Sequence, residues 1–114
     1  MHELGIANSI LAAVRKEADR HTHARVVAVG IQLGELSGVN SEALAFGFES
    51  LVKETELDSL EFHIETTRRR NLCTACKHEF DVVNHDTICP QCGEQLTRLI
   101  GGDEIVITYF EFEE

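Results

Sequence analysis

Four cysteines in two closely spaced pairs constrain the fold of this 114-residue chain more than any other feature. Cys73 and Cys76 form one C-x-x-C pair, and Cys89 and Cys92 form a second pair after 12 intervening residues. Two such turns brought together supply the tetrahedral set of four thiolates that zinc accepts at about 2.3 Å per bond. Gly93, directly after the second pair, offers the permissive backbone that such a turn often needs. We therefore expect a zinc site, structural rather than hydrolytic because four thiolates leave no coordination position open.

The segment that carries the cysteines, residues 67–100, differs from the rest of the chain. It holds all four cysteines and the only proline, has Arg68-Arg69-Arg70 at its start, and is followed by Gly101-Gly102. A piece shorter than about 40 residues seldom buries enough apolar surface to fold without metals, disulfides or association. We interpret residues 67–100 as a zinc-binding module inserted into a domain formed by residues 1–66 plus 101–114.

Other uses of the cysteines stay open at this point. A rubredoxin-like iron site needs the same four-sulfur geometry, and a dithiol redox centre would use one of the pairs. Redox C-x-x-C motifs normally occur singly in a βαβ context, so two matched pairs favour a shared metal ion. His78 and His85 lie inside the module and are further candidates, as ligands or as hydrogen-bonding partners of the thiolates.

Hydrophobic periodicity predicts two helices outside the module. Apolar residues recur every three or four positions from Leu4 to Ala18 and again from Leu44 to Val52, the spacing of amphipathic helices. Asn40 or Ser41 can cap the second helix, which we expect to run to about Glu54.

Three strands are predicted between and after these helices. Residues 26–33 form a nearly continuous apolar and β-branched run that ends at Gly34, and residues 60–65 alternate apolar with polar side chains. The same alternation marks Ile105, Ile107 and Tyr109. The expected fold class is therefore α+β: a small sheet packed on two helices, interrupted by a four-cysteine zinc-ribbon-like module.

Charge and hydropathy exclude several classes of function. The chain has 20 acidic and 10 basic side chains, a net charge of −10, which argues against binding a phosphate backbone. The module has five basic and four acidic side chains, so it carries +1 and the remainder carries −11. Apolar runs are far shorter than the roughly 20 residues of a membrane span, and no basic segment followed by an apolar one marks a secretory signal. We expect a cytoplasmic protein, where cysteines more often bind metals than form disulfides.

The sequence carries no signature of an enzyme. No Ser/His/Asp set, glycine-rich phosphate loop or recognisable carboxylate pair occurs. Two other groups remain as candidate sites: the His21 and His23 pair could bind a metal, and Arg68-Arg69-Arg70 could dock an acidic partner. A hydrophilic connector is the commoner explanation of the histidine pair, and a solvated charge run explains the arginines at least as well.

Met1-His2-Glu3 offers a second candidate metal site. The α-amine, the amide nitrogen of residue 2 and the His2 imidazole can close adjacent chelate rings around one ion, and Glu3 adds an amide or a carboxylate. Nickel(II) and copper(II) favour such nitrogen-rich planar coordination more than zinc does. Alternatively, Glu3 only complements the dipole of the first helix and His2 is solvated. The spacing alone leaves both interpretations open.

Four short motifs spread over the whole chain resemble those of one protein family. They are Met1-His2-Glu3-Leu4, Val29 through Gly34-Glu35-Leu36-Ser37-Gly38-Val39, Phe46-Gly47-Phe48-Glu49, and the cysteine pairs, Cys73-x2-Cys76 and Cys89-Pro90-x-Cys92. The family is that of the HypA/HybF nickel metallochaperones of hydrogenase maturation. The resemblance implies that His2 and Glu3, with the Met1 amine as an additional ligand, bind nickel in an α/β domain, and that Cys73, Cys76, Cys89 and Cys92 hold structural zinc.

The resemblance also implies a function and partners. A protein of this kind is a non-catalytic carrier that works with a HypB-type GTPase and delivers Ni(II) to the large-subunit precursor of [NiFe] hydrogenase, with urease as an additional acceptor. The sequence leaves a homodimer open. The rival interpretation is a zinc-ribbon adaptor or nucleic-acid-binding protein without nickel function. The charge speaks against nucleic acid, because four thiolates and one zinc ion bring the module from +1 to −1.

Overall fold

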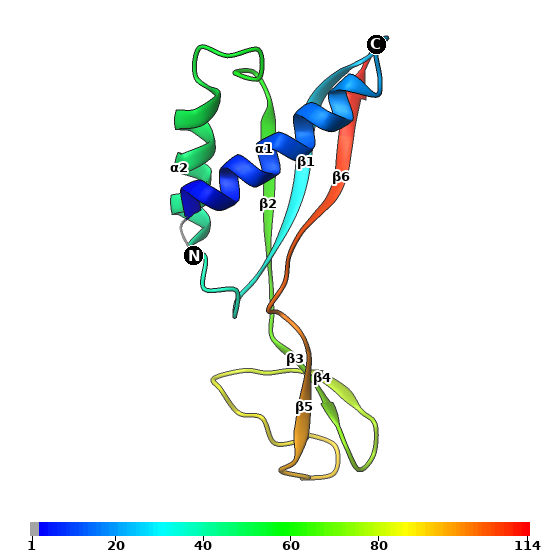
Figure 1. The fold of residues 1–114 in the computed structure, drawn as a ribbon. Coiled ribbons are helices and arrows are strands. Elements are labelled where there is room, and N and C mark those ends of the chain that lie inside the picture. Colours follow the sequence, from blue (N-terminus) through cyan, green and yellow to red (C-terminus); the bar gives the residue numbers. More distant parts are fainter. Residues whose placement is uncertain (1–2) are drawn as a thin grey trace.

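The structure, a computed structural model of the chain, describes residues 3–114 and contains two separate sheets (Figure 1). The helices and strands are α1 (Glu3–Asp19), β1 (Arg25–Gly34), α2 (Ser41–Val52), β2 (Glu61–Thr67), β3 (Arg70–Cys73), β4 (Glu79–Asp81), β5 (Thr97–Gly101) and β6 (Ile105–Glu113). The strand orders are β2-β1-β6 and β4-β3-β5. The molecule is elongated, with extents of 53 × 27 × 16 Å. The predicted α+β fold, with a small sheet on two helices and a separate four-cysteine part, is confirmed.

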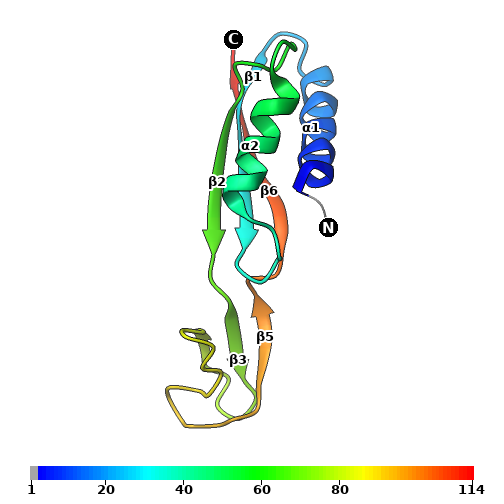
Figure 2. The ribbon, with the colours of Figure 1, turned by 90° about the vertical axis from the view of Figure 1, so that its left-hand side faces the viewer.

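The first sheet has β1 at its centre, parallel to β2 and antiparallel to β6. Both helices lie on one face of this sheet (Figures 1 and 2). The core between them is built from the apolar positions that the periodicities predicted, and the ring of Phe48 stacks on Phe62 with centroids 4.0 Å apart. Its fully buried members are Ala7, Leu11, Val14, Val29, Ile31, Leu33, Leu44 and Phe48. Within residues 3–114, neither helix is long and apolar enough to cross a membrane.

Helix α2 begins as predicted and ends slightly earlier than predicted. The Asn40 side chain caps it, because Asn40 Oδ1 accepts a hydrogen bond from the Ala43 N–H at 2.9 Å. The last helical residue is Val52, and Glu54 has a φ of 64°, which a continuing helix does not allow.

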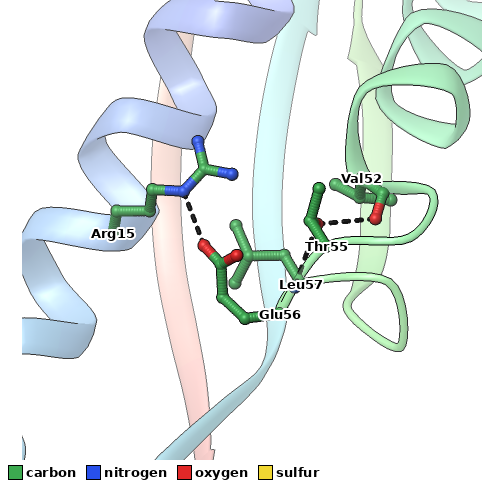
Figure 3. Close-up of polar contacts among 5 residues, drawn as sticks. All are labelled: Arg15, Val52, Thr55, Glu56 and Leu57. Atoms are coloured by element: carbon green, nitrogen blue, oxygen red, sulfur yellow. Dashed lines mark hydrogen bonds and ion pairs between the residues drawn. The ribbon is translucent and has the colours of Figure 1, made fainter.

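The loop after α2 closes one end of the core (Figure 3). The Thr55 hydroxyl donates to the Val52 carbonyl at 2.6 Å and accepts from the Leu57 N–H at 3.2 Å, which directs Leu57 into the core. Arg15 of α1 donates to Glu56 at 2.8 Å, and this contact lowers the pKa of the Glu56 carboxyl. The loop is thereby tied to both helices.

The predicted alternation in the last strand is wrong at Tyr109. Tyr109 pairs with Gly30, while Ile107 pairs with the next residue of β1, so Thr108 is the extra residue of a β-bulge. The bulge turns Tyr109 away from the core, and Phe110 packs there instead. A Cβ on Gly30 would lie 1.9 Å from a Tyr109 ring carbon. The Tyr109 ring therefore packs directly over Gly30, on the face of the sheet opposite the helices.

The two sheets are joined by a junction of backbone contacts. Gly102 has a φ of 98°, and its carbonyl accepts from the Leu36 N–H at 2.7 Å. Glu35 donates its N–H to the Thr67 carbonyl at 2.9 Å and accepts from the Arg69 N–H at 2.9 Å. The second half of the motif from Val29 to Val39 therefore has a structural role, because Glu35 and Leu36 hold together the chain segments that enter and leave the second sheet.

Candidate metal centre

The four cysteines lie together in the part of the chain that forms the second sheet. Cys73 is the last residue of β3, Cys76 follows in a turn, and Cys89 and Cys92 lie between β4 and β5. All four Sγ atoms are within 4.8 Å of one another, with 3.5 Å between Cys73 and Cys92 and 3.7 Å between Cys76 and Cys89. Sulfurs bound tetrahedrally at about 2.3 Å are about 3.8 Å apart. The cluster can therefore hold a metal ion such as zinc, and it is the one such group within residues 3–114.

The two C-x-x-C turns have matching backbone geometry. In the first, the Cys73 N–H donates to the carbonyl five residues on at 2.9 Å, and the Cys73 carbonyl accepts from Lys77 at 3.1 Å. In the second turn, the Cys89 N–H donates to the Glu94 carbonyl at 2.9 Å, and the Cys89 carbonyl accepts from the Gly93 N–H at 2.9 Å. Lys77 and Gly93 both have positive φ values, 66° and 81°. The predicted role of Gly93 is confirmed, and Lys77 adopts the same conformation without being glycine.

The thiols of the cluster differ in acidity. The hydrogen bond from the Cys76 N–H is the main cause that lowers the pKa of Cys73 to about 6. A backbone hydrogen bond at Glu94 lowers the pKa of Cys92, but the neighbouring sulfurs and loss of hydration outweigh it and raise that pKa to about 12. A backbone hydrogen bond at His78 likewise lowers the pKa of Cys76, and burial and the Cys73 sulfur raise it overall. A metal ion must displace the protons of these two thiols.

The cysteines also form most of the core of the second sheet. From Arg70 to Gly101, a range that the structure describes throughout, the buried apolar residues are Cys73, Cys89, Phe80 and Val82. Two of the four are thus themselves candidate ligands. So small an apolar core is typical of modules that need a metal ion to fold.

Asn71 is a residue of the site that the sequence did not point to. It is 1% exposed, and its Nδ2 donates to the Thr97 hydroxyl at 3.0 Å, while that hydroxyl donates to the Thr87 carbonyl at 2.6 Å. These bonds tie β3, β5 and the segment before Cys89 together behind the cluster. The available signal was its position two residues before Cys73, which puts both side chains on the same face of a strand.

The two histidine side chains of this region have other neighbours. The His78 ring stacks on Phe80 with centroids 6.1 Å apart. His85 lines a groove at the junction of the sheets, together with Arg68 and Glu35. Neither ring belongs to the group of potential ligands formed by the cysteines.

The other polar candidates have local partners. His21 Nε2 lies 3.2 Å from a Glu17 carboxylate oxygen, and no third potential ligand within residues 3–114 joins His21 and His23 in a metal-binding group. Arg70, the last residue of the arginine triplet, forms an ion pair with Asp81 at 2.5 Å. Its positive charge is therefore balanced within the second sheet.

Of the residues expected to bind nickel, the structure describes only Glu3, because Met1 and His2 are outside the described residues. Glu3 is the first residue of α1, where its carboxylate complements the helix dipole. This end of α1 packs on α2: a Cβ on Gly47 would lie 3.7 Å from the Leu4 side chain. The motif that contains Gly47 thus lies beside the start of α1.

Comparison with known proteins gives consistent matches over the whole chain. A model of the HypA family, described as "Hydrogenase/urease nickel incorporation, metallochaperone, hypA", matches residues 1–112. The hydrogenase maturation factor HypA of Geobacter metallireducens is 35% identical over 113 residues, 99% of this chain and 100% of the relative. The hydrogenase maturation factor HybF of Klebsiella pneumoniae is 31% identical with the same coverage.

Two solved structures share the fold. The solution structure of the Ni metallochaperone HypA from Helicobacter pylori matches with a TM-score of 0.65 at 21% identity and covers 97% of both chains. A second solution structure of a HypA protein matches with a TM-score of 0.74 at 20% identity, over 99% of this chain and 97% of the other. At these identities the likeness concerns the fold alone.

Proposed function

The chain belongs to the HypA family of metallochaperones for nickel incorporation, and we propose that it binds Ni(II) at its N-terminus and delivers it during the maturation of [NiFe] hydrogenase. The observation that carries this proposal is the family match over residues 1–112, which includes the N-terminal motif and all four cysteines. Relatives matched end to end are hydrogenase maturation factors, which supports the same process for this chain.

We propose His2, Glu3 and the Met1 amine as the nickel ligands. Amine, imidazole and any ligating amide must lose protons to bind, so nickel affinity should fall as the pH drops through the pKa of an imidazole, about 6.5 when unperturbed. Leu4 and Gly5, the next residues, are exposed at the start of α1. A site in such a position can exchange its ion with an acceptor.

The four cysteines have a different role in this proposal. Cys73, Cys76, Cys89 and Cys92 would hold zinc, and their sulfur separations fit a tetrahedral ion of that size. Bound zinc supplies the cross-link that the small apolar core of the second sheet lacks. The Asn71 bonds and the two matched turns orient the sulfurs toward one point.

The family membership supports a proposal about partners and compartment. We propose a HypB-type GTPase and the hydrogenase large-subunit precursor as partners, with residues 67–100 as a zinc-binding module within the nickel-binding domain of residues 1–66 and 101–114. The protein would act in the cytoplasm as a carrier without catalytic activity.

A nickel titration of the untagged, zinc-loaded chain tests the nickel site. The variants are His2→Ala, a chain extended by two residues before Met1, and His23→Ala as the matched histidine control. We expect one Ni(II) per chain by calorimetry, lost in the first two variants and retained in the control, with zinc content unchanged in all. Nickel binding that survives both N-terminal changes would place the site elsewhere, and absence of binding to the unaltered chain would favour a zinc-ribbon adaptor.

A further inference from the structure

We propose that the free edge of β2, with the groove between β2 and α2, binds an extended segment of a partner protein in which apolar and basic residues alternate. This docking surface does not depend on the nickel site, and its occupant is recognised by backbone hydrogen bonds, apolar contact and charge.

The first observation is the unpaired edge of the sheet. In the order β2-β1-β6, strand β2 pairs with β1 alone among the described residues, so one side of Glu61–Thr67 has free backbone donors and acceptors. An exposed edge of this kind can be extended by a strand from another protein. Viewed from this side, β2 and α2 lie next to each other with the edge of β2 uncovered (Figure 2).

The second observation is a groove of about 600 Å³ beside that edge. Its apolar lining comes from Ala45 and Val52 of α2, from Leu60 just before β2, and from Phe62 of β2. Val52 and Leu60 are nearly buried, and the Phe62 ring is fixed by stacking on a core phenylalanine. The floor is therefore preformed and can receive an apolar side chain without rearrangement.

The third observation is the charge around the groove. Its rim has three carboxylates, Glu49, Glu54 and Asp58, against the single amine of Lys53. None of the three carboxylates makes an ion pair within residues 3–114. The first sheet and its helices belong to the part of the chain with a net charge of −11. A cationic segment is the complementary occupant.

An exposed aromatic residue extends the surface along α2. Phe46 is 70% exposed, and it lies three residues before Glu49 and seven before Lys53, on the same side of the helix. Exposed aromatic side chains are enriched at protein interfaces. An occupant longer than the groove would contact Phe46 next.

The pleat of the sheet sets the sequence pattern of the occupant. Side chains of an added strand would point alternately to the helix side, into the groove, and to the uncovered face. On that face β2 presents Glu61, His63 and Glu65, all exposed, and His63 Nε2 lies 3.4 Å from a Glu61 carboxylate oxygen. Apolar residues would therefore enter the groove, and basic residues would face Glu61 and Glu65, while the carboxylates around the groove attract the cationic segment over a longer range. The other free edge, on β6, adjoins a groove of about 450 Å³ that no charged residue lines, so it does not select a cationic segment.

The test uses the zinc-loaded full chain and synthetic peptides as probes. The first probe is an acetylated, amidated nonapeptide of alternating lysine and valine. The second is the same peptide methylated at every internal amide nitrogen, which keeps the charges but cannot donate backbone hydrogen bonds. The third replaces lysine with glutamate. Binding is followed by NMR chemical shifts and amide exchange. The protein variants are Glu49→Lys/Asp58→Lys and, as a control with the same change in net charge, Asp19→Lys/Glu114→Lys.

We expect the lysine peptide to shift resonances of β2 and α2 and to slow exchange of the outward β2 amides. Methylation of the peptide should abolish binding, and the groove variant should weaken it about tenfold while the control changes it less than about threefold. The proposal is overturned if the lysine peptide does not bind at low salt, if the shifts map to β6 or the second sheet, if the methylated or glutamate peptide binds equally well, or if both variants weaken binding alike.

Discussion

Replacing Gly102 by alanine should destabilise the first sheet, because this glycine stands where the two sheets join. Its φ of 98° is unfavourable for any residue with a Cβ, which costs about 1–2 kcal/mol. The new Cβ would also lie 2.5 Å from the Cα of Arg69 and 2.8 Å from the carbonyl oxygen of Arg68. Both are backbone atoms, so the chain itself must move, at a further cost of about 1–3 kcal/mol. We expect the free energy of unfolding to fall by about 2–5 kcal/mol.

Urea unfolding of the zinc-loaded chain measures this effect. Tyr109 is the only tyrosine and the chain has no tryptophan, so its fluorescence reports on β6 of the first sheet. With a slope of about 1–3 kcal/mol per M, a loss of about 3 kcal/mol lowers the unfolding midpoint by about 1–3 M.

The neighbouring glycine provides the control for this prediction. At Gly101 the nearest atom to an added Cβ is the Arg70 Cβ, 4.0 Å away, and φ is not positive. Gly101→Ala should therefore change the free energy of unfolding by no more than about 0.5 kcal/mol. Equal midpoints for the Gly101 and Gly102 variants would show that the junction does not constrain the backbone as described.

Three further predictions concern the core and the cysteines. Phe48→Ala should lower the free energy of unfolding by about 3–5 kcal/mol because the ring is fully buried. Gly47→Ala should raise it by up to about 1 kcal/mol because an added Cβ meets only ordinary contacts at 3.7 Å. Urea unfolding that shifts both variants in the same direction would contradict this. Removing the metal ion with a chelator should collapse the NMR dispersion of residues 70–101 and leave that of the first sheet intact, and persistent dispersion in both would refute a metal-dependent core. Metal affinity should rise with pH, because the thiols of Cys76 and Cys92 have raised pKa values and must release protons to bind. The affinity should fall more steeply below about pH 6, where Cys73 is protonated as well. Calorimetry in two buffers of different ionisation enthalpy counts the released protons, and an affinity independent of pH would exclude this account.

The helices and the strands of the first sheet could be predicted because each follows from a local pattern. Apolar spacing located α1 and α2, and the apolar run before Gly34 located β1. The bulge at Thr108 could not be predicted, because it depends on the register between two strands and on the space above Gly30. Local alternation therefore placed Tyr109 on the wrong face.

The candidate metal centre shows the same division. The clustering of the four cysteines could be predicted from their spacing alone, because each C-x-x-C pair folds into its own local turn. Asn71 was missed because its role depends on Thr97, 26 residues away. Its position on the same face of β3 as Cys73 was a local signal, but that position does not reveal the contact with Thr97. The nickel site remains a prediction from the N-terminal motif and the family, since Met1 and His2 lie outside the described residues.

The elongated arrangement of the two sheets has a practical consequence for determining the mass of the protein in solution. The radius of gyration is 17.8 Å, whereas a compact domain of this length has about 13 Å. A single 12.7 kDa chain should therefore elute early in gel filtration, at a volume typical of a larger globular protein. Light scattering or sedimentation equilibrium, which do not depend on shape, is the appropriate way to distinguish one copy from two. The long axis should also make the NMR relaxation anisotropic, with amides parallel to it relaxing differently from those across it.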